Sequence, residues 1–250
     1  MNRFYIFFLL AFLTILTYSC NNRLENYRPM LVDGYRWNEI GEYDDTGENR
    51  YQTTILRIQG DTTINGKTYK KVMESYTKDM QDWQVSALLR EDIHNQRVYY
   101  LHNGKEFLLY DFGMRVGNKT KLYLCEFYNE ARADDFDYTM ELTAINTKED
   151  NQKNVYREFV YEVTLQHKDD ADKQAFTHCT MERFGSPYGL ISKNMSYILC
   201  DCGYALLCAY NDADILVWSN DYTDTPYAGY CFYNDDENKD GVYSIKYPND

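Results

Sequence analysis

The sequence predicts an all-β protein, an antiparallel meander of β-hairpins that closes as a sandwich or a partly open barrel. Two Asn-Gly pairs, Asn65-Gly66 and Asn103-Gly104, each separate two β-type runs. Such pairs favour the positive φ angles of a two-residue hairpin turn. The 250-residue chain also holds 26 Tyr and 12 Phe but only 4 Pro, a composition that favours strands. After residue 19, we find no run of convincing length with the period of a helix.

Between residues 35 and 127 the expected strands follow one another as an up-and-down meander. They are the runs 50–59, 62–64, 67–76, 83–90, 97–102 and 105–112. A two-residue loop fixes the pairing of the residues behind it. We therefore expect four cross-strand pairs: Ile64 with Lys67, His102 with Lys105, Tyr100 with Phe107, and Tyr99 with Leu108.

The second half of the chain carries longer strand-like runs joined by polar loops. The expected strands are 138–147, 155–167, 175–184, 198–210, 215–219, 231–233 and 242–247. Asn211-Asp212-Ala213-Asp214 is expected as a turn, and the segments 148–154 and 168–173 as charged, exposed loops. Because no Pro/Ser-rich linker divides the chain, we favour a single β domain over residues 35–250. The alternative is two β subdomains with a boundary near 129–136.

Residues 1–19 have the pattern of a signal peptide. Arg3 supplies a positive charge, and residues 4–16 are apolar except for Thr14. Such a run is short for a membrane span and suits a signal peptide. Ser19, a small residue, directly precedes Cys20, as in the lipobox of bacterial lipoproteins. We therefore expect cleavage before Cys20, acylation of Cys20 with chains such as palmitate, and a lipidated tether over residues 20–34. An ordinary secretory signal is the alternative.

The net charge of −13 restricts the partners. A chain this acidic has little with which to neutralise a phosphate backbone, so we expect no nucleic-acid partner. The same charge opposes electrostatic docking on anionic lipid, so attachment to the lipid bilayer is expected to rest on the acyl chains of Cys20.

Six cysteines remain when Cys20 is set aside: Cys125, Cys179, Cys200, Cys202, Cys208 and Cys231. An even number in an exported protein favours disulfide bonds among them. Cys200 and Cys202 would lie on one face of a strand, about 6–7 Å apart along it, so we expect no bond between these two.

The sequence assembles no catalytic site. Ser186 lies in a Gly-Ser-Pro-Tyr-Gly segment that lacks the Gly-x-Ser-x-Gly spacing of a nucleophile elbow, so it reads as part of a turn. His178-Cys179 and Cys200-x-Cys202 could form a zinc site, but structural zinc usually uses Cys pairs two to four residues apart. The acid pairs Asp134-Asp135 and Asp169-Asp170 read as solvated loop charges. We therefore predict no catalytic residue and no required cofactor.

One loop resembles a calcium site. Asp236, Asn238 and Asp240 stand at alternate positions and Gly241 follows, which is the start of a calcium-binding loop. The bidentate glutamate expected at position 12 is replaced by Tyr247. A polar hairpin loop is the alternative.

Several segments resemble phrases that recur in exported Bacteroidetes proteins of unknown function. They are Gly60–Lys71, Ala87–Glu91, Val98–Tyr100, Leu108–Phe112, Val116-Gly117 and Glu182–Leu190. The resemblance spans about residues 29–220. It implies a secreted β protein of a Gram-negative periplasm or outer surface, and it brings no catalytic residue with it.

Together these patterns lead us to expect a non-enzymatic lipoprotein of the cell envelope, a β-rich binding or structural module at the outer membrane. Residues 21–25 do not form the acidic cluster that the resemblance associates with surface export, which favours the periplasmic face. Two other functions remain open: a glycan-directed hydrolase that uses two carboxylates, and a calcium-dependent adhesion module.

Overall fold

The computed structural model describes residues 27–45, 48–123, 136–168, 173–191, 204–221, 223 and 225–234. The described chain is all-β, as predicted. Its strands are β1 (Arg36–Asp45), β2 (Glu48–Ile64), β3 (Lys67–Ser75), β4 (Gln84–Asp92), β5 (Arg97–His102), β6 (Lys105–Asp111), β7 (Lys119–Thr120), β8 (Phe136–Glu149), β9 (Val155–His167), β10 (Lys173–Met181), β11 (Tyr204–Tyr210) and β12 (Leu216–Ser219).

The strands form two antiparallel sheets. The larger sheet has the order β12-β11-β1-β2-β3-β4-β5-β6, so the predicted meander of the first half is confirmed from β2 to β6. The smaller sheet has the order β10-β9-β8-β7. The chain then returns to the larger sheet, where β11 pairs with β1. The sequence analysis placed no strand at β1 and did not predict this return.

Both Asn-Gly turns have the predicted form. Asn65, Gly66, Asn103 and Gly104 all have positive φ, between 47° and 76°. The expected pairs are confirmed: Ile64 with Lys67, His102 with Lys105, Tyr100 with Phe107, and Tyr99 with Leu108.

The predicted register ends at a β-bulge in the second hairpin. Val98 lies opposite Tyr110, so Leu109 is an extra residue on β6. Leu109 and Tyr110 are both buried. A bulge turns consecutive side chains away from strict alternation, which explains how two adjacent apolar residues reach the core.

Several strand ends differ from the prediction by one or two residues, and three differences are larger. The runs 50–59 and 62–64 belong to the single strand β2, which has a bulge between Ile58 and Asp61. The expected strand 175–184 ends at Met181, where the amide of Gly185 donates to the Met181 carbonyl and closes a turn. Residues 231–233 form no named strand, although the Thr53 amide donates to the Tyr233 carbonyl. Residues 198–203 and 242–247 lie outside the described part.

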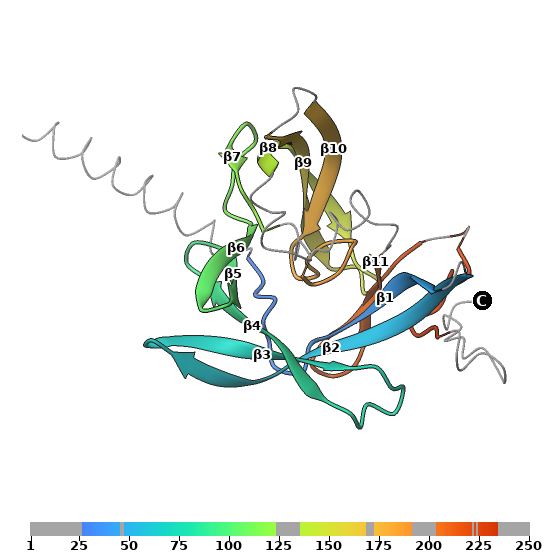
Figure 1. Ribbon diagram of the computed structural model, residues 1–250. Coiled ribbons are helices and arrows are strands. Elements are labelled where there is room, and N and C mark those ends of the chain that lie inside the picture. Colours follow the sequence, from blue (N-terminus) through green and yellow to red (C-terminus); the bar gives the residue numbers. More distant parts are fainter. Residues whose placement is uncertain are drawn as a thin grey trace, which may run out of the picture.

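The two sheets share one hydrophobic core. In Figure 1 the large sheet curves beneath the small one. Buried side chains from both sheets belong to the same hydrophobic cluster. The rings of Phe112, after β6, and Phe159, on β9, lie 5.5 Å apart between centroids. Because buried apolar area is the main favourable term in folding, this contact couples the two sheets.

Cys208 and Cys231 form a disulfide, so one of the expected bonds is present. It ties β11 to the segment after residue 230, with the two Cα atoms 5.3 Å apart. Cys179 carries a free thiol, and burial raises its pKa to about 11. Cys125, Cys200 and Cys202 lie outside the described residues.

We expect Gly104→Val to lower the free energy of unfolding by about 1–2 kcal/mol, because an L side chain resists the left-handed region. This loss is larger than the contribution of one cross-strand side-chain pair, which is roughly 0.2–1 kcal/mol. An added Cβ would meet nothing within 4 Å, so the loss reports the φ angle and not crowding. Urea denaturation measures it. Lys105→Val is the control, and an equal loss for both variants would contradict the prediction.

Candidate functional site

The segment from Met181 to Leu190 lies between the two sheets. Tyr110 Oη donates to the Leu190 carbonyl at 2.5 Å, and the Leu190 amide donates to the Glu39 carboxylate. Gly189 has a φ of +116°, and a Cβ there would approach the Glu39 carboxyl carbon to 2.7 Å. The chain can pass this close to a buried carboxylate only because residue 189 is glycine.

Two ion pairs fix this segment, one half-buried and one buried on both sides. Arg157 on β9 donates to both Glu182 oxygens at 3.0 Å, and its Nη2 also donates to Gln96 Oε1 at 3.1 Å. Arg183 pairs with Asp150 at 3.0 Å. A buried charge is tolerated when it is paired and hydrogen-bonded. The Arg157 pair therefore joins the small sheet to the β4–β5 turn of the large one.

The N-terminal part of the described chain is held by the half-buried carboxylate of Glu91. Glu91 accepts a hydrogen bond from Tyr27 Oη at 2.5 Å and from the amides of Met30 and Leu31 at 3.0 and 3.1 Å. Burial raises the pKa of Glu91, against the opposing effect of these hydrogen bonds. Tyr27, Met30 and Leu31 are themselves buried, so this part of the expected tether packs into the core.

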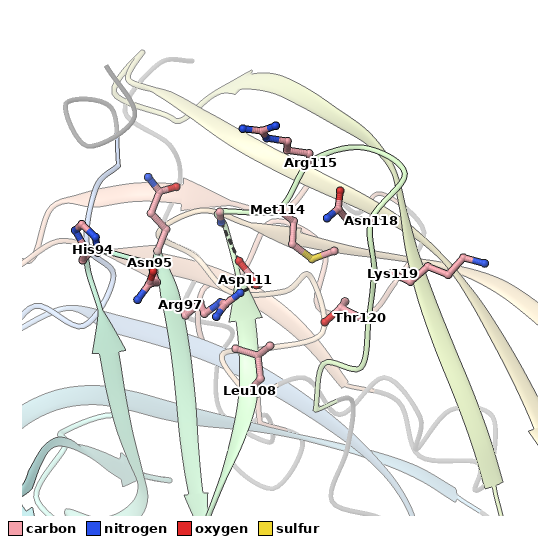
Figure 2. A pocket seen from close by; sticks show the side chains of 12 residues that line it. His94, Asn95, Arg97, Leu108, Asp111, Met114, Arg115, Asn118, Lys119 and Thr120 are labelled. Carbon is pink, nitrogen blue, oxygen red and sulfur yellow. Dashed lines mark hydrogen bonds and ion pairs between the residues drawn. The ribbon is translucent and has the colours of Figure 1, made fainter. Parts of the chain in front are cut away.

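Next to these contacts lies a pocket of about 790 Å³. It is lined by the β4–β5 turn, by β6 and by the loop that leads to β7. Figure 2 shows His94 and Asn95 on one side and Asn118 and Lys119 on the other. The lining residues are His94, Asn95, Gln96, Arg97, Leu108, Asp111, Gly113, Met114, Arg115, Asn118, Lys119 and Thr120.

The pocket carries more cationic than anionic side chains. Arg97 pairs with Asp111 at 2.8 Å, and this hydrogen bond raises the pKa of Arg97. Asp111 also accepts a hydrogen bond from the Gly113 amide at 3.1 Å, so its carboxylate has both a cationic partner and a backbone donor. Lys119 reaches Glu141, outside the pocket, at 3.4 Å. Among the residues that the structure describes, Arg115 has no ion-pair partner.

This arrangement suits a small polar ligand with an acidic group. Ligand sites typically have volumes of about 300–1,000 Å³ and a few fixed polar groups. Arg115 is free to pair with a carboxylate or phosphate. Among the described residues that line the pocket, Asp111 is the only carboxylate, whereas a glycosidase-type hydrolase uses two acids.

The residues weighed for catalysis or zinc have structural contacts. Ser186 is buried, and its Oγ accepts from the Tyr188 amide at 3.2 Å. His178 is buried beside the rings of Tyr161 and Tyr188, and burial lowers its pKa to about 4. His178 and Cys179 are neighbours on β10, so they point to opposite faces. Within the described ranges no group of three or more His, Cys, Asp or Glu could hold a metal ion.

The remaining site predictions fall outside the described residues. They concern Cys20, the calcium candidates Asp236, Asn238 and Asp240, the zinc candidates Cys200 and Cys202, and the acid pairs Asp134-Asp135 and Asp169-Asp170.

Comparisons with protein-family models, curated proteins and solved structures gave no match for this chain. Among the described residues, no helix is long and apolar enough to cross a membrane.

The sequence analysis missed the pocket residues. Asp111 and Gly113 stand in or beside the Leu108–Phe112 phrase, but nothing in that phrase marks Asp111 as buried. Its partner Arg97 lies fourteen positions earlier and becomes its neighbour through the β5–β6 hairpin. The expected register of the β5–β6 hairpin places Arg97 near Asp111, at the C-terminal end of β6. This register was the one signal in the sequence that could have indicated the pair.

We expect Asp150→Asn to lower the free energy of unfolding by about 3–5 kcal/mol, because it leaves Arg183 charged and buried. The two side chains are 0% and 6% exposed. The control is Glu149→Gln, at the residue before Asp150. It removes the exposed ion pair between Glu149 and Lys153 and should lower the free energy of unfolding by less than about 1 kcal/mol. Urea denaturation measures the free energy of unfolding of both variants. An equal loss in both would contradict the prediction for the buried pair.

Proposed function

We propose that this chain is a lipoprotein of the cell envelope, anchored in the outer membrane through acylated Cys20, whose β body binds a small acidic ligand. Binding takes place in the pocket between the β4–β5 turn and the loop after β6. The single observation that carries the binding function is Arg115, which lines a polar pocket beside the Arg97–Asp111 pair and has no ion-pair partner in the part of the chain that the structure describes.

The anchor is supported by the sequence. An apolar run ends in Ser19-Cys20, and Tyr27, the first residue that the structure describes, is buried in the body seven positions after Cys20. The periplasmic face of the membrane is favoured because no acidic cluster follows Cys20.

A binding role agrees with the pocket better than a hydrolase does. Asp111 is held by Arg97 and by the Gly113 amide, so it is poorly placed to exchange a proton with a substrate. A calcium-dependent adhesion module depends on Asp236, Asn238 and Asp240, and no observation on the described chain favours it.

The first test concerns the anchor. We expect the purified protein to carry a diacyl- or triacylglyceryl group on Cys20, detected by intact-mass analysis, and Cys20→Ala to leave the membrane fraction. Thr17→Ala, three residues earlier, is the control and should stay membrane-bound. A Cys20→Ala protein that still partitions fully with membranes would contradict the proposed anchor.

The second test concerns the pocket. We expect glucuronate to bind the full-length protein and glucose to bind much more weakly, because only glucuronate offers a carboxylate to Arg115. Arg115→Gln should weaken glucuronate binding about tenfold or more, the usual effect of losing a charged hydrogen bond. Lys105→Gln, at the far end of the β5–β6 hairpin, is the matched control. Titration calorimetry measures all four, and equal affinity for both sugars would reject the acidic ligand.

A further inference from the structure

Three features far apart in the sequence meet at one end of the molecule. The β4–β5 turn follows Glu91, which holds Tyr27, and the Phe112 amide donates to the Gln96 carbonyl of that turn at 2.8 Å. The rings of Tyr27 and Phe112 lie 6.2 Å apart. In Figure 1 the described chain accordingly begins beside β5 and β6. The start of the body, the β4–β5 turn and the β6–β7 loop therefore share this end.

Two of the most exposed large apolar side chains of the described structure lie at the same end. Ile93, in the β4–β5 turn, is 53% exposed, and Val116, in the β6–β7 loop, is 57% exposed. Each stands next to a residue that lines the pocket, His94 and Arg115 respectively. A single exposed apolar side chain is ordinary on a protein surface. What distinguishes Ile93 and Val116 is their shared position, at the end of the body where the described chain begins.

The length of chain before Tyr27 limits which phase that is. Six residues separate Cys20 from Tyr27. Even fully extended, the seven steps from Cys20 to Tyr27 span at most about 25 Å. Because Glu91 fixes Tyr27 to the body, an acylated Cys20 would keep this end close to the bilayer, whatever the orientation of the remainder.

The charges at this end are also compatible with a lipid surface. Arg28 and Arg115 are exposed there, and their charges are opposite to those of lipid phosphates. The chain as a whole carries −13, so these two arginines set this end apart from the average charge of the protein.

From these observations we infer that the end formed by the β4–β5 turn and the β6–β7 loop rests on the phospholipid bilayer. Ile93 and Val116 enter the boundary between headgroups and acyl chains, and the exposed Arg28 faces the headgroup phosphates. The inference rests on the proposed lipid anchor, since it is the anchor that brings this end to the membrane. It adds a contact of the protein body to the membrane attachment through the acyl chains.

The test uses lipidated full-length protein on vesicles of phosphatidylcholine and phosphatidylglycerol with brominated acyl chains, which quench tryptophan at short range. Ile93→Trp and Val116→Trp report this end. Val85→Trp and Val155→Trp are matched controls, because these residues are 55% and 53% exposed and lie at the start of β4 and of β9. We expect quenching of the added tryptophan to be several-fold stronger at 93 and 116 than at either control. Equal quenching at all four positions, or stronger quenching at a control, would overturn the inference.

Two further measurements keep the outcome clear. Flotation of the vesicles shows whether the protein is anchored. A protein that lacks acyl mass and does not float with the vesicles overturns the proposed anchor. A protein that floats but shows no quenching at 93 and 116 overturns the orientation alone. Hydrogen exchange of the unsubstituted protein covers the case in which a tryptophan variant fails to fold. We expect slower exchange on vesicles at 93–96 and 114–118 than at 84–86, and unchanged exchange at the loop segments would contradict the inference.

Discussion

Burial of charge between the two sheets is the constraint on which the rest of this structure depends. Glu182 and Arg183 follow β10 into the interior, and neither could remain there without a partner. Their partners, Arg157 and Asp150, come from β9 and from the turn before it. Because these pairs form only when the strands are in place, a small displacement of the sheets would leave unpaired charges buried. This makes the packed arrangement much more favourable than nearby alternatives.

The same contacts set the shape of the candidate site. Arg157 also donates to Gln96, so the interior network reaches the β4–β5 turn that forms one wall of the pocket. The opposite wall is tied to the small sheet, since the Gly117 amide donates to the Leu142 carbonyl at 2.7 Å. Both walls are thus fixed before any ligand arrives, and a preformed site loses little entropy on binding. The pocket is a consequence of how the sheets meet.

Much of the fold could be predicted because its signals are local. The Asn-Gly turns determined the hairpins, and alternation along 155–167 gave β9 with its observed limits. The contacts that build the site are not local. The partners Arg157 and Glu182 lie 25 residues apart, and Glu39 and Leu190 lie 151 apart. With 39 acidic residues in the chain, nothing in the sequence distinguishes the few buried carboxylates from the many solvated ones.

The pairing of β1 with β11 has a consequence for how the chain folds. The two strands are separated by the whole of the meander and the small sheet, so one edge of β1 cannot be paired until nearly all of the chain is present. Until then, that edge offers free amide and carbonyl groups to any other extended chain. Contacts of such high sequence separation form slowly, which makes the interval before β11 arrives the period of greatest exposure to aggregation. This period ends when β11 pairs with β1 and the Cys208–Cys231 bond forms.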